Sequence, residues 1–405
     1  MESGYKKIEL YIHIPFCVKK CNYCDFLSFA ADRRVQEEYM EALFSEIRGR
    51  AEEYAAYRVT SVFIGGGTPS IVETKWIVGL MELVRELFWL EADAEITIEV
   101  NPGTVSREKL EDYIGVGINR LSIGLQSANA EELSRLGRIH SFAAFLETYE
   151  AARTAGFKNV NVDVMSALPG QGLSSYLDTL QRVLSLTPPP EHISAYSLIV
   201  EEGTPFARWQ QEGSLDVPDE ECERLMYEET KRVLERAGMH RYETSNYALE
   251  GYECRHNCGY WRRVNYVGFG IGAASLVENV RFQNADSLQK YLEEPLSCRC
   301  EQHALSLQEQ MEEFMFLGLR MTAGVSDKEF YRVFGQRLTE VYGQVIAKNM
   351  EEGLLHYLTG TKKAANHAVS PEEHEGLKQE RWLALTDRGM DISNYVMAQF
   401  LFDTD

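Results

Sequence analysis

The hydrophobic positions in the first two-thirds of the chain follow two alternating periods. Six short segments place apolar residues at every second position or in compact β-branched runs, as strands do, near 8–14, 59–64, 96–100, 121–125, 160–164 and 192–200. Longer amphipathic segments between them predict helices near 35–53, 74–89, 106–115, 129–136, 142–155 and 173–186. Strands that alternate with helices indicate parallel βαβ units. We therefore predict an α/β fold, a partial (β/α)6 barrel, with a doubly wound sheet as the less favoured alternative.

The pattern changes after about residue 205. An acidic helix is predicted over 218–237, and an aromatic, glycine-rich stretch follows from Tyr242 to Ala274. Beyond residue 306 the periodicity is mainly helical, and the expected elements are helices over 307–320, 327–334 and 337–352, a strand over 383–386 and a last helix that ends at Phe402. These elements predict a smaller, mostly helical C-terminal domain of winged-helix type.

On this basis we divide the chain into three regions. A barrel is expected over 1–240, a connecting region over 241–300 and the helical domain over 301–405. Residues 357–380 are polar and include Gly, Lys, Asn, Ser, Pro and Glu, and we expect them to form a mobile loop.

The charge balance limits the partners. The chain has 62 Asp and Glu against 41 Lys and Arg, a formal charge of −21, whereas binding to nucleic-acid phosphates needs a basic surface. No apolar run reaches the roughly 20 residues that cross a bilayer, and the first residues lack the apolar core of a signal peptide. We therefore expect a cytoplasmic protein without nucleic-acid partners or a membrane span, and peripheral membrane contact stays open.

Three of the eight cysteines lie close together, with the spacing C-x3-C-x2-C at Cys17, Cys21 and Cys24. In a reducing compartment such spacing indicates metal or redox chemistry rather than structural disulfides. Three thiolates can hold three irons of a [4Fe–4S] cube and leave the fourth iron open for a substrate or cofactor. The alternative is a structural zinc ion, which normally needs a fourth Cys or His. His13 is close in sequence, but its strand position predicts that it points away from this loop.

Polar residues near the ends of three predicted strands are candidates for a second part of the site. Glu99, Gln126 and Asp163 each stand opposite an aliphatic strand face. In βα barrels such positions line the mouth, where active sites lie. The alternative is that these side chains are simply solvated.

The cysteine loop resembles that of the radical S-adenosylmethionine (SAM) enzymes, because it follows the first strand and has Tyr23 directly before its last cysteine. The resemblance implies that Cys17, Cys21 and Cys24 hold a [4Fe–4S] cluster. It also implies that SAM chelates the open iron through its amino and carboxylate groups. In these enzymes the cofactors supply the radical chemistry, and the protein binds, orients and shields them.

The resemblance extends over nearly the whole chain to the coproporphyrinogen III dehydrogenase group. The segments that carry it are Tyr11-x-His13-Ile14-Pro15-Phe16-Cys17, Gly65-Gly66-Gly67-Thr68-Pro69-Ser70, Glu99-Val-Asn101-Pro102, Arg120-Leu-Ser122-Ile-Gly124-Leu-Gln126-Ser127 and Asp163-Val-Met-Ser-Ala-Leu168-Pro169-Gly170.

Two features resemble the HemW heme chaperone branch in particular. His256-Asn257-x-x-Tyr260-Trp261 matches the H-N-x-x-Y-W motif of that branch. The dehydrogenases carry a further cysteine two positions after the third one, where this chain has Phe26.

The resemblance implies roles for a set of SAM-contacting residues. The glycine-rich turn of Gly66, Gly67 and Thr68 would contact the SAM amino group, since glycine lets a backbone approach a ligand closely. Glu99 would lie near SAM.

Five further residues match SAM-contacting positions of the family. Arg138 would pair with the SAM carboxylate by two parallel bonds, and Asp163 would contact the ribose hydroxyls. Gln126 would also contact SAM, and Tyr11 and Tyr23 would flank it. Without the resemblance, Arg138 would be interpreted as a surface charge.

His256 is the candidate for contact with heme, since histidine is a common axial ligand and neighbouring aromatic residues offer flat apolar contact. Arg255, Arg262 and Arg263 would then pair with the heme propionates. The alternative is that His256 only packs the bottom of the barrel. Cys254 and Cys258 beside it are expected to be ordinary buried thiols.

The resulting hypothesis is a heme chaperone that binds a [4Fe–4S] cluster, SAM and heme and delivers heme to acceptors such as respiratory hemoproteins. The main alternative is an oxygen-independent coproporphyrinogen III dehydrogenase, which decarboxylates its substrate oxidatively to protoporphyrinogen IX. A radical SAM enzyme for another substrate and a non-catalytic zinc module are further alternatives. The sequence alone does not decide whether SAM is cleaved.

Overall fold

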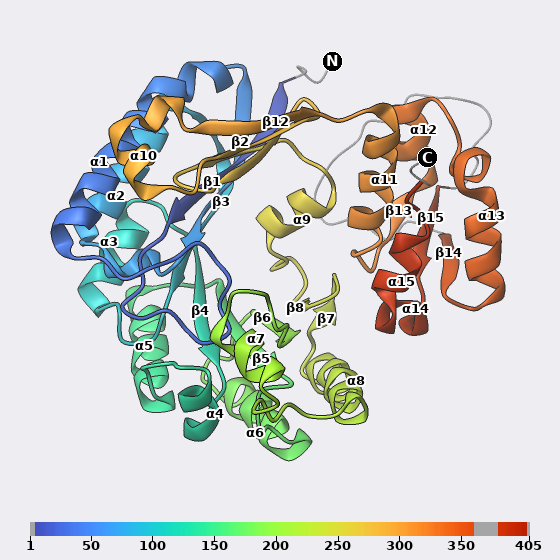
Figure 1. The fold of residues 1–405 in the computed structure, drawn as a ribbon, viewed down its shortest axis with the longest axis horizontal. Coiled ribbons are helices and arrows are strands. Elements are labelled where there is room, and N and C mark those ends of the chain that lie inside the picture. The colour runs from blue at the N-terminus through green and yellow to red at the C-terminus, as the bar shows by residue number, and fades with distance from the viewer. Residues whose placement is uncertain (1–4, 360–379, 403–405) are drawn as a thin grey trace. The chain divides into compact units, whose positions relative to one another are not determined.

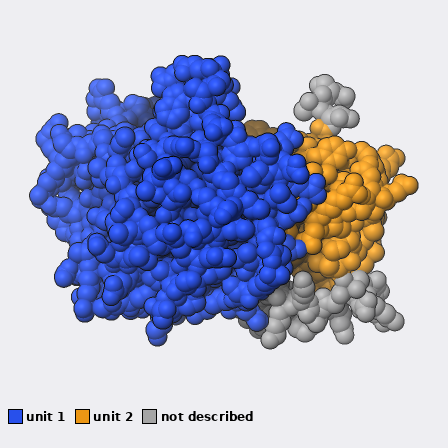
Figure 2. All heavy atoms as spheres, turned by 90° about the horizontal axis from the view of Figure 1, so that it is seen from below, with its two compact units in different colours: residues 1–240, 245–256, 265–302 blue, residues 241–244, 257–264, 303–405 orange. Residues whose placement is uncertain are grey.

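The computed structural model describes residues 5–359 and 380–402, which divide into two compact units (Figure 2). The first unit comprises Met1–His240, Ser245–His256 and Asn265–Gln302, and the second comprises Arg241–Thr244, Asn257–Val264 and His303–Asp405. The region expected as a connector, 241–300, is therefore divided between the two units, and most of it belongs to the first.

The first unit is built on the predicted succession of parallel strands (Figure 1). The six strands are β1 (Lys6–Ile14), β2 (Tyr57–Gly66), β3 (Trp89–Val100), β4 (Arg120–Gln126), β5 (Val160–Ser166) and β6 (His192–Ser197). Each pairs in parallel with the next one along the chain. This order confirms the prediction of consecutive βα units.

Helices connect these strands, as the periodicity predicted. They are α1 (Arg33–Arg50), α2 (Thr74–Leu87), α3 (Arg107–Gly115), α4 (Ala130–Arg135), α5 (Phe142–Ala155) and α6 (Leu173–Leu184). Four of them begin with an N-cap residue whose side chain accepts a hydrogen bond from a backbone N–H of the first turn. These residues are Asp32, Ser106, Asn129 and Ser141. Strand β3 begins at Trp89, seven positions before the predicted segment, because its first half is largely exposed and lacks apolar alternation.

Alternation along β1 separates a hydrophobic face from a polar one. Ile8, Leu10 and Ile12 are fully buried in the core cluster that also contains the inner faces of the helices. Burying each such side chain contributes roughly 1.5–3 kcal/mol. Glu9 and His13 occupy the other face and are also buried, so both faces of this strand are covered.

The sheet continues beyond the six predicted strands. Its order is β12-β11-β10-β9-β1-β2-β3-β4-β5-β6-β8-β7, and β9 (Tyr266–Phe269) pairs in parallel with β1. The other added strands are β7 (His240–Arg241), β8 (Asn246–Ala248), β10 (Ala274–Val277), β11 (Val280–Asn284) and β12 (Arg299–Ala304). These strands span two to six residues, which is too short for a clear period-two signal.

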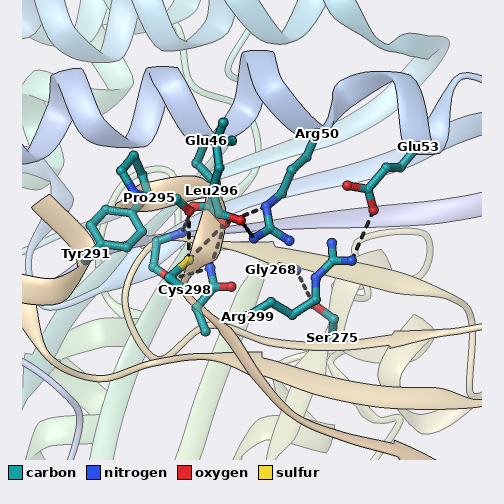
Figure 3. Close-up of polar contacts among 12 residues, drawn as sticks. Glu46, Arg50, Glu53, Gly268, Ser275, Tyr291, Pro295, Leu296, Cys298 and Arg299 are labelled. Atoms are coloured by element: carbon teal, nitrogen blue, oxygen red, sulfur yellow. Dashed lines mark hydrogen bonds and ion pairs between the residues drawn. The ribbon is translucent and has the colours of Figure 1, made fainter. Parts of the chain in front are cut away.

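The buried side chain of Glu46 on α1 forms hydrogen bonds with the segment that contains the added strands β9 to β12 (Figure 3). Glu46 accepts hydrogen bonds from Tyr291 Oη at 2.7 Å, Asn284 Nδ2 at 2.7 Å and the Gly270 amide at 2.9 Å. One turn along α1, Arg50 donates to the carbonyl of Leu296 at 2.6 Å. The added strands are therefore held to α1 by polar bonds as well as by the sheet.

Cys298 belongs to the same cluster. Its thiol donates to the Pro295 carbonyl at 2.9 Å, and burial raises its pKa to about 12. Such a protonated, buried thiol is a packing residue rather than a reactive one.

The second unit is mostly helical, as predicted. Its elements are α11 (Leu307–Gly318), β13 (Val325–Ser326), α12 (Asp327–Phe334), α13 (Leu338–Glu351), β14 (Leu355–Thr359), β15 (Arg381–Leu385), α14 (Asp387–Asp391) and α15 (Ser393–Ala398). The three strands form an antiparallel sheet in the order β13-β15-β14. Of the loop expected over 357–380, residues 357–359 belong to β14 instead, and residues 360–379 lie outside the described residues.

The remaining helices of the first unit are α7 (Pro205–Gln211), α8 (Glu220–Arg236), α10 (Leu288–Glu293) and the beginning of α9 (Arg255–Trp261). Within 5–359 and 380–402, no helix combines the length and the apolar composition that a bilayer span requires.

Candidate functional site

The three-cysteine loop directly follows β1, at the end where parallel barrels place their sites. The Cys17 amide donates to the Phe29 carbonyl at 3.0 Å, and the Phe29 amide donates to the Pro15 carbonyl at 2.8 Å. These two bonds close the loop at its base. Cys17, Cys21 and Cys24 are all partly exposed and free.

The three thiols lie close enough to influence one another. Burial raises the pKa of Cys21, and the charges of Cys24 and Cys17 also raise it, while Arg138 acts in the opposite direction. Burial likewise raises the pKa of Cys24. A metal cluster that takes these sulfurs as thiolates would offset this cost, because coordination favours the deprotonated form.

A single metal ion and a cube place different demands on the three sulfurs. Within the described ranges, no three His, Cys, Asp or Glu side chains gather closely enough to hold one metal ion. A zinc ion requires each sulfur at about 2.3 Å from the same point, whereas a [4Fe–4S] cube distributes its cysteines over different irons.

His13 corrects one expectation, because it points toward the loop segment and not away from it. Its Nε2 donates to the Leu27 carbonyl at 2.8 Å, three residues after Cys24. Burial lowers the pKa of the ring, so it is neutral and its Nδ1 accepts the hydroxyl proton of Tyr11 at 3.0 Å. With both nitrogens used, His13 fixes the end of the loop and is not a metal ligand in this arrangement.

The glycine-rich turn after β2 packs against the base of the same loop. Gly66 has a φ of +114°, and a Cβ there would lie 2.6 Å from the His13 ring. A Cβ on Gly67 would lie 2.7 Å from the backbone oxygen of Phe16. The Thr68 amide donates to that same oxygen at 2.7 Å. The glycines are therefore required for the contact between the two loops, whereas their predicted contact with SAM stays a prediction.

A chain of hydrogen bonds leads from the first cysteine to Tyr23. Asn101 Nδ2 donates to Thr68 Oγ1 at 2.7 Å, and Thr68 Oγ1 lies 3.6 Å from Cys17 Sγ. Arg138 donates to Asn101 Oδ1 at 2.8 Å and to Tyr23 Oη at 3.1 Å. Because Thr68 accepts from Asn101, its own proton is available to the Cys17 sulfur. Four predicted site residues are thus joined by one that was not assigned a role, Asn101.

Arg138 has donor capacity left over. Its Nε is buried and makes no hydrogen bond within the part of the chain that the structure describes. An orphaned guanidinium nitrogen of this kind suits an anionic ligand such as a carboxylate. The surface-charge interpretation of Arg138 is therefore wrong, since the side chain is only partly exposed and joins two site residues.

Two carboxyl groups, Glu99 on β3 and Asp163 on β5, influence each other across the intervening strand β4. Burial raises the pKa of Glu99 to about 7, and the charge of Asp163 adds to the shift. Burial also raises the pKa of Asp163, against hydrogen bonds such as that from Asn161 Nδ2 at 2.7 Å. Glu99 accepts a bond from the Gly66 amide at 3.2 Å. A cationic ligand such as the ammonium or sulfonium of SAM would stabilise both carboxylates.

Gln126 has a strained backbone conformation, and its side chain bonds to a residue of another strand. Its φ is +71°, which is rare for a residue with a side chain, and its Oε1 accepts a hydrogen bond from Tyr196 Oη at 3.0 Å. Tyr196 comes from β6 and was not identified from the sequence, because a tyrosine in a strand ordinarily indicates packing.

Asn22 is a second residue without a sequence signal. Its backbone N–H donates to the Leu136 carbonyl at 2.9 Å, and its side-chain Nδ2 donates to the Arg135 carbonyl at 2.8 Å. Its backbone carbonyl accepts from the Phe206 N–H at 3.1 Å. It thereby connects the cysteine loop with the segments that follow β4 and β6.

His256 is connected to Tyr11 through Phe63, since the Tyr11 and Phe63 ring centroids lie 6.4 Å apart. The His256 ring is 1 % exposed, its Nδ1 lies 2.8 Å from Ser61 Oγ, and it stacks on Phe63 with ring centroids 5.2 Å apart. Burial lowers its pKa to about 3, so the ring is neutral. This is the environment that the packing alternative expects. Heme contact would require the ring to become exposed, and it stays a prediction.

Two of the three arginines near His256 are already paired. Arg255 donates to Asp93 Oδ2 at 3.1 Å in the first unit. Arg263 donates to Glu313 Oε2 at 2.9 Å in the second unit, where both side chains are buried. The expected pairing of these arginines with propionates would therefore have to replace existing ion pairs. Cys254 and Cys258 are buried, as expected, and the Cys254 thiol donates to Glu95 Oε1 at 3.5 Å.

Comparison with known proteins agrees with the arrangement of these elements. Residues 11–183 match the sequence model of the Radical SAM superfamily, and residues 305–358 match that of the HemN C-terminal domain. In its fold the chain is similar to coproporphyrinogen III oxidase from Escherichia coli, with a TM-score of 0.82 over 98 % of this chain and 91 % of that one, at 23 % identity.

Two curated relatives match over nearly their whole length. The heme chaperone HemW of Bacillus subtilis is 37 % identical over 89 % of this chain and 97 % of its own. The heme chaperone HemW of Lactococcus lactis is 32 % identical over 98 % of both chains. With the cysteine loop and the barrel in place, these matches show that the chain belongs to the HemW family of radical SAM proteins.

Proposed function

We propose that this protein is a heme chaperone that holds a [4Fe–4S] cluster and SAM in its barrel, binds heme and passes it to acceptor hemoproteins. The observation that carries the proposal is the match over nearly the full length to relatives named heme chaperones. The site described above supports the cofactor part, because its donors suit the groups that the two cofactors present.

Different residues would bind the cluster and SAM. Cys17, Cys21 and Cys24 would hold the cluster, and Thr68 would donate to the first of these sulfurs. Arg138, with its unused Nε, would bind the SAM carboxylate, and Glu99 would accept from the SAM ammonium. When bound, the two cofactors supply one-electron chemistry.

A second candidate function is the oxidative decarboxylation of coproporphyrinogen III. The fold similarity to an enzyme with that name favours it, although a similarity at 23 % identity concerns the fold alone. The cysteine that the dehydrogenases carry after the third ligand is replaced here by Phe26. We therefore rank this function second.

The same proposal includes the cell compartment and the acceptor proteins. Three cysteine thiols that must stay reduced to hold a cluster suit the reducing cytoplasm. The proposed acceptors include respiratory hemoproteins, and delivery to those at a membrane would involve peripheral membrane contact.

One anaerobic sample tests both functions. The purified protein is reconstituted with iron and sulfide, then titrated with hemin by difference absorbance and assayed with coproporphyrinogen III, SAM and dithionite. We expect saturable heme binding and no protoporphyrinogen. The absence of heme binding would overturn the proposal, and formation of protoporphyrinogen would favour the second function.

Cysteine variants separate the cluster from general folding effects. Cys21→Ser should lose the bound iron and the brown chromophore. Cys222→Ser, a matched change on α8 outside the loop, should keep both. Equal iron content in the two variants would contradict the assignment of the cluster ligands.

A further inference from the structure

The four most exposed large hydrophobic side chains of the described residues lie in segments near one end of the barrel. Among the residues that the structure describes, Ile199, Ile139, Phe26 and Val18 are 68 %, 65 %, 64 % and 60 % exposed, and every other large hydrophobic residue is at most 53 % exposed. We call these four residues the apolar rim. Exposed apolar side chains cost hydration free energy, so a cluster of them indicates a binding surface.

Three of the four residues lie on loops that follow the carboxyl ends of parallel strands, and the fourth, Ile139, lies directly after Arg138, whose guanidinium bonds to Tyr23 of the cysteine loop. Val18 and Phe26 lie between β1 and α1, Ile139 lies between α4 and α5, and Ile199 directly follows β6. Carboxyl ends of parallel strands meet at one end of a barrel. The rim therefore borders the same mouth as the cysteine loop and Arg138.

Hydrogen bonds bring these three loops together at Asn22. This residue of the cysteine loop bonds to the Arg135 and Leu136 carbonyls, a few positions before Ile139. Its carbonyl accepts from the Phe206 amide, in the segment that follows Ile199. The ring of Tyr23 also lies 6.5 Å from that of Phe206. The rim is thus held around a common centre by bonds that do not involve its own side chains.

The charges around the rim are unequal. Lys19 and Lys20 are exposed beside Val18, and the Lys20 ammonium donates to the Phe26 carbonyl at 2.9 Å. Glu201 and Glu202 are exposed two and three positions after Ile199. In a chain with a formal charge of −21, an anionic group would be attracted to the lysine side and repelled from the glutamate side.

The size of the surface favours a small ligand over a protein. A stable protein interface buries about 800 Å² on each partner with some 20–30 residues, far more than four side chains on three loops supply. Heme combines a flat apolar face with two carboxylates on one edge, which matches an apolar rim with cations on one side.

We propose that heme docks face-on against the apolar rim, with its propionate edge toward Lys19 and Lys20 and its other edge toward Ile199. The inference rests on the proposed heme chaperone function and adds the docking surface and the orientation. It places the heme at the barrel mouth, next to the cysteine loop, and not at His256.

The test is a hemin titration of cluster-loaded protein and its variants. Ile139→Ser combined with Ile199→Ser should raise the Kd for hemin about tenfold or more. Leu225→Ser, which changes an exposed hydrophobic residue on α8, should leave the Kd unchanged. Iron and sulfide contents confirm that the variants keep the cluster.

Orientation is tested with a ligand that lacks the carboxylates. Lys19→Glu should weaken the binding of hemin but not that of hemin dimethyl ester, and Glu201→Gln should weaken neither. Equal loss with both ligands would overturn the orientation.

The outcomes separate this inference from the proposed function. Wild-type protein that binds hemin, together with a double variant that binds it equally well, would overturn the rim and leave the chaperone proposal standing. Wild-type protein that binds no hemin would overturn both. A double variant that binds hemin normally but fails to pass it to an acceptor would show that the rim contacts the acceptor protein, which also overturns the inference.

Discussion

The guanidinium of Arg138 donates a hydrogen bond to Asn101 Oδ1 over 2.8 Å. Asn101 can then turn only its Nδ2 toward Thr68, which leaves the Thr68 hydroxyl proton available to the Cys17 sulfur. One arginine therefore orients a chain of donors that ends on a proposed cluster ligand. The same arginine keeps a buried, unused Nε for a ligand.

Arg138→Lys should weaken SAM binding and leave the cluster in place. A lysine keeps the charge but has no planar fork, so it cannot serve Tyr23, Asn101 and a carboxylate together. We expect the Kd for SAM to rise by about tenfold or more, which corresponds to about 1.4 kcal/mol, as measured by equilibrium dialysis of cluster-loaded protein. Arg34→Lys on the exposed face of α1 is the matched control and should change nothing. Equal affinities in the two variants would contradict the proposed role.

Gly66→Ala should damage the contact between the glycine-rich turn and the cysteine loop. The new Cβ would combine a φ of +114° with a distance of 2.6 Å to the His13 ring, and each kind of strain costs on the order of 1–3 kcal/mol. Because His13 also holds Leu27, iron loading should fall together with the free energy of unfolding. Both quantities can be measured on the same preparation, by iron analysis and anaerobic urea denaturation.

Gly251→Ala is the control that measures the cost of a positive φ without a steric contact. Gly251 has a φ of +85°, but a Cβ there would meet nothing within 4 Å. We expect it to cost about 1 kcal/mol and to leave the iron content unchanged. If both alanine variants lost equal stability, the close approach to His13 would not be the reason for glycine at position 66.

Glu99→Gln should change how stability depends on pH. The folded protein holds the Glu99 proton more tightly than the unfolded chain, because burial raises its pKa from 4.5 to about 7. The stability due to this proton is fully present below pH 4.5 and is lost as the pH rises through about 7. Glutamine has no proton to release, so the variant should be more stable than the wild type above pH 7, by roughly 1–3 kcal/mol.

Unfolding curves at pH 5 and pH 8 check this difference. Glu86→Gln, an exposed position on α2, should shift both curves equally or not at all. A Glu99→Gln variant that is no more stable at pH 8 than at pH 5, relative to the wild type, would mean that Glu99 titrates normally.

The barrel could be predicted from the sequence because its strands are buried on their aliphatic side and leave a clear alternation, as in Ile8, Leu10 and Ile12. The added strands β9 to β12 could not, because they are short and their attachment depends on distant partners. Glu46 illustrates this, since its bonds reach Gly270, Asn284 and Tyr291, more than 220 positions away. No local pattern records such a contact.

In the candidate site, too, residues with a local sequence pattern could be predicted, and residues that depend on distant contacts could not. Cys17, Cys21 and Cys24 could be identified because three ligands fall on one loop at a characteristic spacing. Asn101 and Asn22 were missed, since their value lies in hydrogen bonds to segments brought near by the fold. His13 was expected to point away from the loop, because strand alternation gives the face of a side chain but not what the following loop folds back to meet.

His256→Ala should lower stability without changing heme affinity. The substitution removes the bond to Ser61 Oγ and the stacking on Phe63, and we expect a loss of about 2–4 kcal/mol in the free energy of unfolding. His256→Phe should recover part of that loss, because it restores the stacking but not the bond. Since the ring is 1 % exposed, both variants should bind hemin within about twofold of the wild type, which is under 0.5 kcal/mol. If both variants instead lost heme binding while the stability of His256→Phe recovered, His256 would be a heme ligand that becomes exposed on binding, and the packing interpretation would be wrong.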